Sequence, residues 1–417
     1  MARTEYFASD DPVIVEDPAP PSRREREASA RSARTRRRRR RTIAAVLVIV
    51  LLPVAWSYIG ALRAPGTDSV SARSVEWLRD HHFGGIVDRV ESWWYSHNPP
   101  PVGGKPKGGI PAAPKPVPTV STAAPANGST PSIADGALPV PARVPTAAGT
   151  PLAGEGVWQP SGLTVGGKSA VYVTYVRPDA IHTSLLSGIV WLDPKLLRVK
   201  LVPGLVEPPR ADKSWGARIP PDQRTNLVAA FNSAFRVQDS RGGYFENGRM
   251  LTPLRTGGAT AVVRADGTMS VGTWGRDFTS TDGLVAARQN LDLIVDHGAV
   301  VPGLPKNSSG AWGATLNSRI YVWRSGVGVT ANGAIVYVAG AGLSVESVAD
   351  LLHRAGAVRA MELDINPEWV TCYIYERPNP SQPGVVTGNQ ILGSGQRNGN
   401  RYLEPGTRDF FAWFARS

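Results

Sequence analysis

The chain has 417 residues, of which 36 are proline and 44 are glycine, and its formal net charge is +12. With this much proline and glycine, the sequence excludes a protein in which every segment belongs to a folded core. The only cysteine, Cys372, excludes an intramolecular disulfide, so we expect stability to come from an apolar core.

The first 42 residues contain 12 arginines and 7 acidic residues and contribute +5 to the net charge. Few large apolar side chains accompany these charges. Such a segment cannot bury enough apolar surface to fold, which predicts a disordered basic tail on the cytoplasmic side.

Residues 43–62 (IAAVLVIVLLPVAWSYIGAL) contain no charge over twenty positions, about the length that crosses the hydrocarbon core of a bilayer. The segment predicts one transmembrane helix in the cell membrane. A signal peptide is the alternative, but no clear small-residue cleavage pattern follows Leu62. Because residues 36–41 are all arginine, the positive-inside rule predicts a cytoplasmic amino terminus and an extracytoplasmic location for residues 63–417. Beside an apolar span, this tract indicates topology and contact with anionic lipid, and not nucleic-acid binding.

Residues 69–95 place apolar side chains at helical spacing, which predicts a juxtamembrane amphipathic helical segment within residues 63–97. Trp93, Trp94 and Tyr95 are predicted either to lie at the membrane interface or to pack on a second copy, making a homo-oligomer. Residues 98–151 contain 14 of the prolines and hardly any large apolar residue, which is typical of an extended linker.

From residue 152 onward, strand patterns dominate and only one long helical pattern, residues 344–357, is clear. The turn sequences ADGT (265–268) and ANGA (331–334) predict hairpins. These patterns favour an α+β domain over residues 152–417, with a mixed, mostly antiparallel sheet and few helices. Strands are predicted at residues 170–176, 188–193, 197–204, 226–231, 259–264, 319–324 and 334–340.

The stretch MELDINPEW, residues 361–369, places Glu362 and Asp364 two positions apart on an apolar strand that follows the helix, so both side chains point to the same face. Pro367 ends the strand. Two carboxylates in this position indicate a site. The alternative is that both are solvated residues on a half-exposed strand, which is common in sheets.

Three segments, AAFNSAF (229–235), RSGVGVTANGAIVYVAG (324–340) and the helix leading into AMELD (360–364), resemble the successive motifs of the phosphodiester glycosidase family, in a membrane-anchored bacterial-type arrangement. The resemblance covers roughly residues 160–415. Asn232 matches the family's Asn before a Gly-Gly-aromatic turn, Arg324 matches its Arg, and Asp364 matches the Asp of Leu-Asp-Gly-Gly-Gly-Ser.

The sequence departs from the family pattern at both glycine turns. Ser233 and Ala234 stand where the family has Gly-Gly, and Ile365, Asn366 and Pro367 replace the glycines after the aspartate. Glycines would allow a ligand to approach the backbone closely, whereas proline fixes the chain and removes a donor. We therefore expect the acid to be retained on a rebuilt loop.

The resemblance implies cleavage of the bond between a sugar and a phosphodiester. Because phosphate is a good leaving group, such a site needs cations more than an acid on the leaving oxygen. Arg324 is the first candidate to hold the phosphate, followed by Arg255. Asp364 is the candidate catalytic carboxylate. Further candidates are Glu362, Glu368 or Glu246 as the second carboxylate, Asn232 as a substrate-binding amide, and Trp369 as a stacking surface.

Two functions of different classes follow from these residues. The first is a membrane-tethered extracytoplasmic hydrolase of sugar-1-phosphodiester linkages in cell-envelope glycans, with transfer to another acceptor as a variant. The second is a non-catalytic glycan-binding domain of the same fold, in which the rebuilt loop has abolished turnover. No HExxH or short histidine pair predicts a metal site in the outer domain, and the sequence identifies no cofactor.

Overall fold

A computed structural model describes residues 22–64, 66, 68–116, 136–304, 312, 321–392 and 399–416, without the side chains of residues 25, 26, 28–30, 33, 88 and 91–96. The predicted roles of Trp93, Trp94 and Tyr95 therefore lie outside the described side chains. The chain divides into two compact units, one ending at Arg63 and the other beginning at Ala64.

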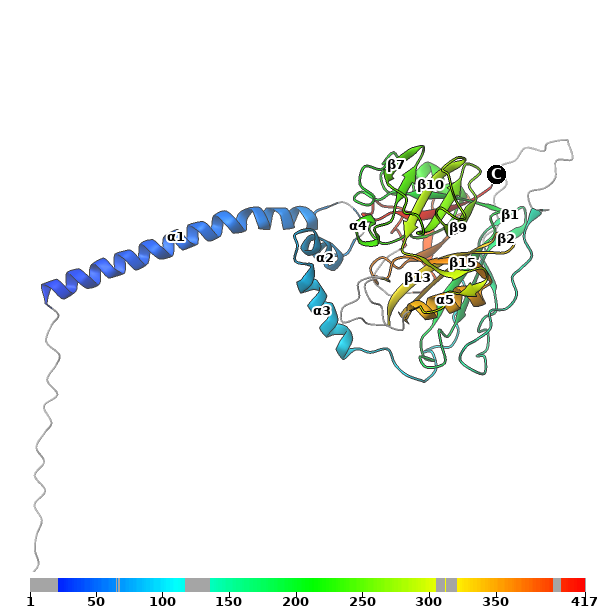
Figure 1. Cartoon of the computed structure of the whole chain (residues 1–417), viewed down its shortest axis with the longest axis horizontal. Helices are drawn as coiled ribbons and strands as arrows, with labels where there is room; N and C mark the ends of the chain where they lie inside the picture. The colour runs from blue at the N-terminus through cyan, green and yellow to red at the C-terminus, as the bar shows by residue number, and fades with distance from the viewer. Residues whose placement is uncertain are drawn as a thin grey trace, which may run out of the picture. The chain divides into compact units, whose positions relative to one another are not determined.

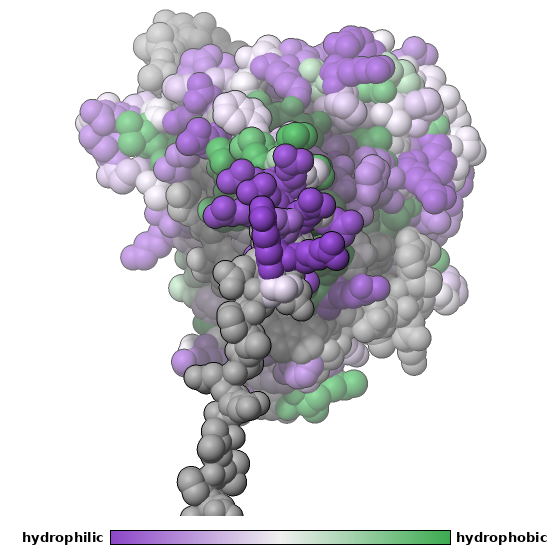
Figure 2. Space-filling view, turned by 90° about the vertical axis from the view of Figure 1, so that its left-hand side faces the viewer, coloured by the Kyte–Doolittle hydropathy of each residue, from purple (hydrophilic) through white to green (hydrophobic). Residues whose placement is uncertain are grey.

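The first unit contains one long helix, α1 (Arg23–Leu62), which is labelled and drawn in blue in Figure 1. The tail that we predicted to be disordered is helical from Arg23 onward. Arginine, alanine and glutamate favour helix, and Arg23 pairs with Glu27 one turn later. Residues 34–62 are long and apolar enough to cross a membrane, a property shared by anchors and signal sequences. Figure 2, seen toward the amino-terminal end of α1, shows strongly hydrophilic side chains in front.

The second unit is built around an eight-stranded sheet, and every strand pair in it is antiparallel. Its central strands β14, β13 and β15 carry two of the motifs described above. The order across the sheet is β1 (Gln159–Val165), β2 (Lys168–Val176), β3 (Ser187–Leu192), β14 (Ile335–Leu343), β13 (Val322–Thr330), β15 (Ala357–Glu362), β11 (Leu293–Asp296) and β12 (Ala299–Val300).

Two five-stranded antiparallel sheets complete the β-structure. One contains β7 (Arg249–Thr252), β6 (Tyr244–Glu246), β10 (Leu284–Asn290), β8 (Ala259–Arg264) and β9 (Met269–Thr273). The other contains β17 (Thr387–Gln390), β16 (Cys372–Glu376), β5 (Leu227–Asn232), β18 (Phe410–Ala415) and β4 (Leu197–Val202). Cys372 is 2% exposed, and burial raises the pKa of its thiol.

Helix α5 (Val345–Arg354) covers one face of the eight-stranded sheet, and the sheet of β5 and β18 packs on the other. The helix begins at the Ser344 cap, whose hydroxyl accepts a hydrogen bond from Ser347 N–H. It approaches β13 closely because Gly326 has no side chain: a Cβ there would lie 2.9 Å from Leu352 and Val348. The predicted α+β class and mostly antiparallel pairing are confirmed.

Shorter helices surround the sheets. They are α2 (Val70–Asp80), α3 (Gly84–His97), the 3-10 helix η2 (Pro221–Asn226) and α4 (Val237–Ser240). Ser69 caps α2 by accepting a hydrogen bond from Ala72 N–H. The two described parts of the predicted linker, residues 98–116 and 136–151, both contact the domain. Ala113 N–H donates to Gln159, and Leu138 N–H donates to Asp193.

Candidate active site

The three family motifs meet where β5 and β15 end and β13 begins. Asn232, the last residue of β5, donates from Nδ2 to Ser325 Oγ at 2.9 Å. Ser325, on β13, donates in turn from Oγ to the backbone oxygen of Asp364 at 2.8 Å. The N–H of Asp364 donates to Ser233 O at 3.3 Å, so two sheets are joined directly beneath this carboxylate.

The Asn232 amide is fully engaged with protein atoms. Its Nδ2 also donates to Ser233 O at 2.9 Å, and its Oδ1 accepts from Tyr337 Oη at 2.8 Å and from Thr371 N–H at 3.2 Å. Asn232 is only 4% exposed, and its amide hydrogen bonds connect neighbouring strands. The side chain therefore directs no free donor or acceptor at a ligand.

Arg324 and Glu362 form a buried ion pair across β13 and β15, and neither side chain has any exposed surface. Arg324 also donates from Nε to Leu343 O at 3.0 Å. Burial raises the pKa of Glu362, and the Arg324 guanidinium opposes this rise. The alternative in which Glu362 lies on a solvated face is therefore wrong. The guanidinium group of Arg324 pairs with the Glu362 carboxylate, so its charge faces Glu362 and not the solvent.

Asp364 lies just beyond β15 and is 5% exposed. Its Oδ1 accepts a hydrogen bond from Asn366 N–H at 2.9 Å. Burial raises the pKa of Asp364 from 3.8 to about 6, while the positive charge of Arg408 opposes the rise and the negative charge of Glu76 adds to it. A carboxyl group with this pKa changes its protonation state near neutral pH, as an acid or base catalyst must.

The rebuilt loop after Asp364 is held by its own hydrogen bonds. Asn366 Oδ1 accepts from Glu368 N–H at 2.9 Å, and Asn366 O accepts from Trp369 N–H at 2.8 Å. Where the family has conformationally free glycines, the backbone of this loop is held by hydrogen bonds to aspartate and asparagine side chains. The loop places Trp369 against Arg408, which also interacts with Asp364, and directs Glu368 toward Ser69 and Ser71.

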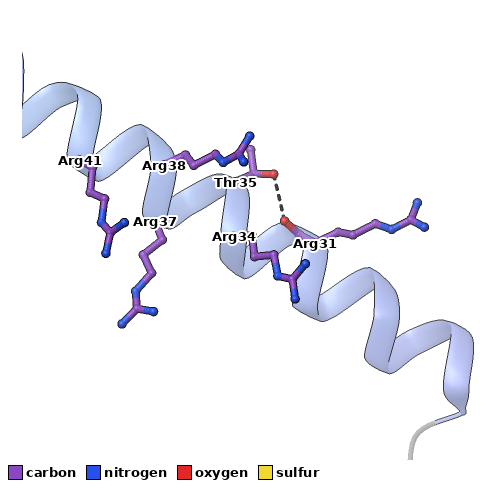
Figure 3. Close-up of a pocket in the computed structure, with 6 residues that line it drawn as sticks. All are labelled: Arg31, Arg34, Thr35, Arg37, Arg38 and Arg41. Atoms are coloured by element: carbon purple, nitrogen blue, oxygen red, sulfur yellow. Dashed lines mark hydrogen bonds between the residues drawn. The ribbon is translucent and has the colours of Figure 1, made fainter.

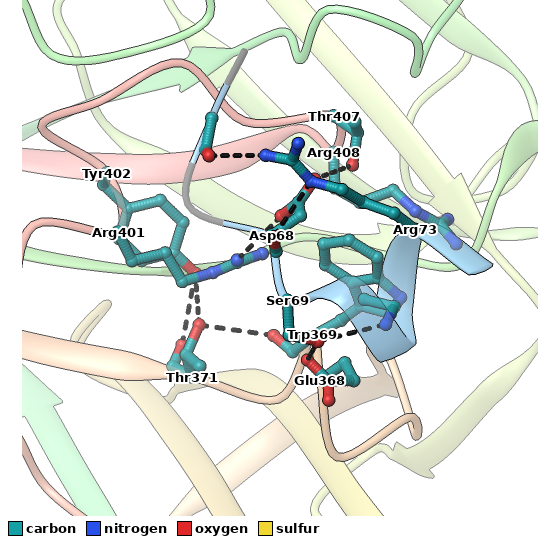
Figure 4. Close-up of polar contacts among 12 residues, drawn as sticks. Asp68, Ser69, Arg73, Glu368, Trp369, Thr371, Arg401, Tyr402, Thr407 and Arg408 are labelled. Atoms are coloured by element: carbon teal, nitrogen blue, oxygen red, sulfur yellow. Dashed lines mark hydrogen bonds and ion pairs between the residues drawn. The ribbon is translucent and has the colours of Figure 1, made fainter. Parts of the chain in front are cut away.

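Arg401 and Arg408 meet the ring of Trp369 (Figure 4), with their guanidinium carbons 5.0 and 4.9 Å from its centroid. Trp369 is only 3% exposed, so its ring packs on cations and is not open to a sugar. Arg408 interacts electrostatically with Asp364. The positive charge next to Asp364 therefore comes from Arg408, and Arg401 is connected to it through the shared ring of Trp369.

Arg255 and Glu246 lie elsewhere in the second unit. Arg255 pairs with Asp292 at 2.8 Å on the surface. Glu246, on β6, accepts a hydrogen bond from Asp212 N–H at 2.9 Å, and burial raises its pKa. In the described part of the chain, neither side chain interacts with Asp364 or Glu362. The structure therefore brings together Asn232, Arg324, Glu362 and Asp364, links Trp369 to Asp364 through Arg408, places Glu368 on the same loop, and leaves these two apart.

Arg401 and Arg408 were missed because sequence reasoning followed the family motifs, and neither arginine belongs to them. The available signal was the charged segment RYLEPGTRDF immediately before the apolar strand β18. Charges next to a buried strand are often solvated, so the signal was weak.

Two other features bear on the location of a site. The arginines of α1 line a hollow along one side of that helix (Figure 3), but its walls come from α1 alone, so no second element closes it. Among the residues that the structure describes, no group of three or more histidine, cysteine or acidic side chains is placed to hold a metal ion.

The buried acids and the arginines beside them form a polar cluster within a β-rich scaffold, and a comparison with known families bears on its class. Residues 225–364, which include Asn232, Arg324 and Asp364, match the model of the phosphodiester glycosidase family. The predicted family resemblance is thereby confirmed over this segment. No curated protein sequence matches the chain.

Two solved structures are similar to the chain at low identity. One is the catalytic domain of zebrafish N-acetylglucosamine-1-phosphodiester alpha-N-acetylglucosaminidase, auto-inhibited by its pro-peptide, at 12% identity and a TM-score of 0.36, covering 59% of this chain and 82% of that one. The other is a hypothetical protein from Synechocystis, at 14% identity and a TM-score of 0.38, covering 61% of this chain and 64% of that one.

Removing Arg324 should destabilise the fold. We expect Arg324→Ala to lower the free energy of unfolding by about 3–5 kcal/mol, because Glu362 is left charged and buried without its partner. Arg255→Ala, which breaks a surface ion pair, should cost no more than about 1 kcal/mol. Urea unfolding of the full chain in detergent checks both. Equal stability of the two variants would contradict the buried pair, and recovery of stability in Arg324→Met with Glu362→Leu would support it.

Asp364 should make the folded protein less stable as the pH rises. Its folded pKa of about 6 lies above its ordinary value of 3.8, so protonation favours the folded state fully below about pH 4, and this contribution is lost through about pH 6. Asp364→Asn keeps a neutral side chain at every pH. We expect the variant to match the parent at pH 4 and to exceed its free energy of unfolding by about 3 kcal/mol at pH 7.5. A pH-independent difference would refute the raised pKa.

Proposed function

We propose that the second unit hydrolyses the bond between the anomeric carbon of a sugar and a phosphodiester. The observation that carries this proposal is the match of residues 225–364 to the phosphodiester glycosidase family, since the matched Asp364 lies in a buried site next to arginines. Water attacks the anomeric carbon and the carbon–oxygen bond breaks. The phosphomonoester leaves with the electron pair, so the products are a free sugar and a phosphomonoester.

Asp364 is the proposed catalytic carboxylate in this reaction. Its raised pKa suits the removal of a proton from the attacking water, and its charge stabilises the positive charge that develops on the sugar ring. Glu368 is the proposed second carboxylate because it follows Asp364 on the same loop. Arg408 is proposed to hold the phosphate, because guanidinium groups pair with phosphate oxygens. Arg324 acts by fixing Glu362 and the end of β13.

A non-catalytic glycan-binding domain is the second candidate. The replacement of the family's glycines by Ile365-Asn366-Pro367 favours this second candidate. The loop has side chains and is held by internal hydrogen bonds, which limits the approach of a substrate to the backbone. The hydrolase is preferred because a buried carboxyl group with a raised pKa destabilises the folded protein, a cost that binding alone does not require.

The activity is tested by incubating the full chain in detergent with sugar 1-phosphodiesters of both anomers. We expect equal amounts of free sugar and phosphomonoester. Asp364→Asn should lower kcat about 10²- to 10⁴-fold, the usual loss when an acid–base group is removed. Asp292→Asn, the same change at a surface position, should retain parent activity. Retained activity in Asp364→Asn would refute its catalytic role, and glycan binding without any turnover would favour the second candidate.

We further propose that α1 is a membrane anchor and that the second unit lies outside the cytoplasm, where cell-envelope glycans are its substrates. The arginines at residues 36–41 directly before the apolar span support this orientation. Protease added to intact cells should digest the chain beyond residue 64 and leave a tag at the amino terminus protected. Digestion of the tag but not of the second unit would reverse the topology, and loss of α1 from the mature protein would identify a signal sequence.

A further inference from the structure

Helix α3 begins with three apolar side chains that the described residues leave uncovered. Phe83, immediately before the helix, is 47% exposed, Ile86 is 51% exposed and Val90 is 62% exposed. Because positions three and four apart lie on the same face of a helix, these side chains are neighbours, and we call them the apolar stripe. None of the three packs against the hydrophobic clusters of the β-rich domain.

The apolar stripe is one side of an amphipathic helix. Beside it, Val87 is only 4% exposed, and α3 packs on α2 (Figure 1). Gly85 lies on the far side of α3, where it is exposed and has open space around it. A contiguous row of exposed apolar side chains on a helix with a polar far side is typical of a surface that binds a partner.

A second copy of the chain, one of the two partners expected from sequence for this segment, needs more apolar surface than the apolar stripe offers. Even a large aromatic side chain buries only about 150–250 Å² in full, so the exposed fractions of these three supply at most about 400 Å². A stable interface buries about 800 Å² on each partner. The apolar stripe is therefore too small to hold two chains together.

A bilayer surface needs less area because the chain is already tied to it if α1 spans the membrane. Helix α1 ends at Leu62 and α2 begins at Val70, so seven residues, 63–69, join them. Seven residues extend no more than about 25 Å. A short tether gives an effective concentration on the order of millimolar, so a weak apolar contact is sufficient.

The charges of this segment indicate that the contact with lipid is apolar. Residues 63–97 contain four arginines and five acidic residues, so no excess of positive charge is present. Electrostatic attraction to anionic lipid requires clustered lysine or arginine side chains. We therefore expect α3 to bind an uncharged lipid surface, and salt to have little effect on the binding.

We propose that the apolar stripe of Phe83, Ile86 and Val90 lies in the headgroup region of the bilayer that α1 crosses, with α3 in the plane of the membrane. This inference rests on the proposal that α1 is an anchor, and it is independent of the hydrolase. Helix α2 contacts α3, and its Glu76 pairs with Arg408 at 2.8 Å. Helix α3 in this position therefore holds the candidate site close to the lipid surface.

Photo-crosslinking of the full chain in phosphatidylcholine liposomes tests this surface. A benzophenone amino acid is placed at Ile86 or Val90, at Gly85 on the far side of the same helix, or at Val385, a loop residue that is also 51% exposed. We expect about tenfold more lipid adduct at Ile86 and Val90 than at the two control positions, because the apolar face of an interfacial helix is buried among the lipids. Equal yields at Ile86 and Gly85 would overturn the proposal. Crosslinks from Ile86 to a second copy, in place of lipid, would assign the apolar stripe to a dimer.

A benzophenone at Ile49, which is 69% exposed in α1, tests the anchor separately. Lipid adducts at Ile49 but not at Ile86 would refute the apolar stripe and keep the anchor, whereas no adducts at either position would refute both. Because no measurement depends on turnover, failure of the proposed hydrolase has no bearing on the result.

A pair of substitutions tests whether the contact is apolar. With the benzophenone at Phe83, Ile86→Asn with Val90→Asn should lower the yield of lipid adduct about tenfold, since two apolar side chains are lost. Gly85→Asn, the matched change on the far side, should leave the yield unchanged. Retained adducts in the double variant, or their loss from the parent in concentrated salt, would overturn the apolar contact.

Discussion

The fold around the site depends on one constraint, the burial of two opposite charges on neighbouring strands of the eight-stranded sheet. Arg324 and Glu362 lie on adjacent central strands with no exposed surface, so each is stable only because the other is present. Asn232 and Ser325 continue the connection to the backbone of Asp364. Polar side chains are thus used to fix the ends of three strands, and the carboxyl group of Asp364 takes its position from them.

This arrangement separates motif residues that hold strands together from Asp364, the proposed catalytic carboxylate. The polar atoms of Asn232 and Arg324 contact neighbouring strands, whereas Asp364 interacts with Arg408. A motif residue that supports the site is as necessary as one that reacts, because a small displacement of a catalytic group costs much of its effect. Activity lost on changing Arg324 would for this reason say little about phosphate binding.

Local patterns were sufficient to predict much of the fold. Strand β8 was predicted with its observed bounds, and α5 within a few residues, because apolar spacing and the Ser344 cap are local signals. The division into three sheets was not predictable, since it depends on pairings such as β5 with β18 that are distant in sequence. Motif positions also made Asp364 a candidate, but not Arg408. The proximity of Arg408 to Asp364 depends on the packing of the segment before β18 against the loop after β15, which is distant in sequence.

The lone thiol of Cys372 has a practical consequence for the study of this protein. It is buried between strands and its pKa is raised, so it is neither accessible nor readily deprotonated. A cysteine introduced on the surface, for example in place of an exposed residue of α2, would be the only reactive thiol in the chain. Fluorescent and spin labels could then be attached at a single chosen position without removing a native cysteine, and motions of α2 could be followed in the otherwise unaltered protein.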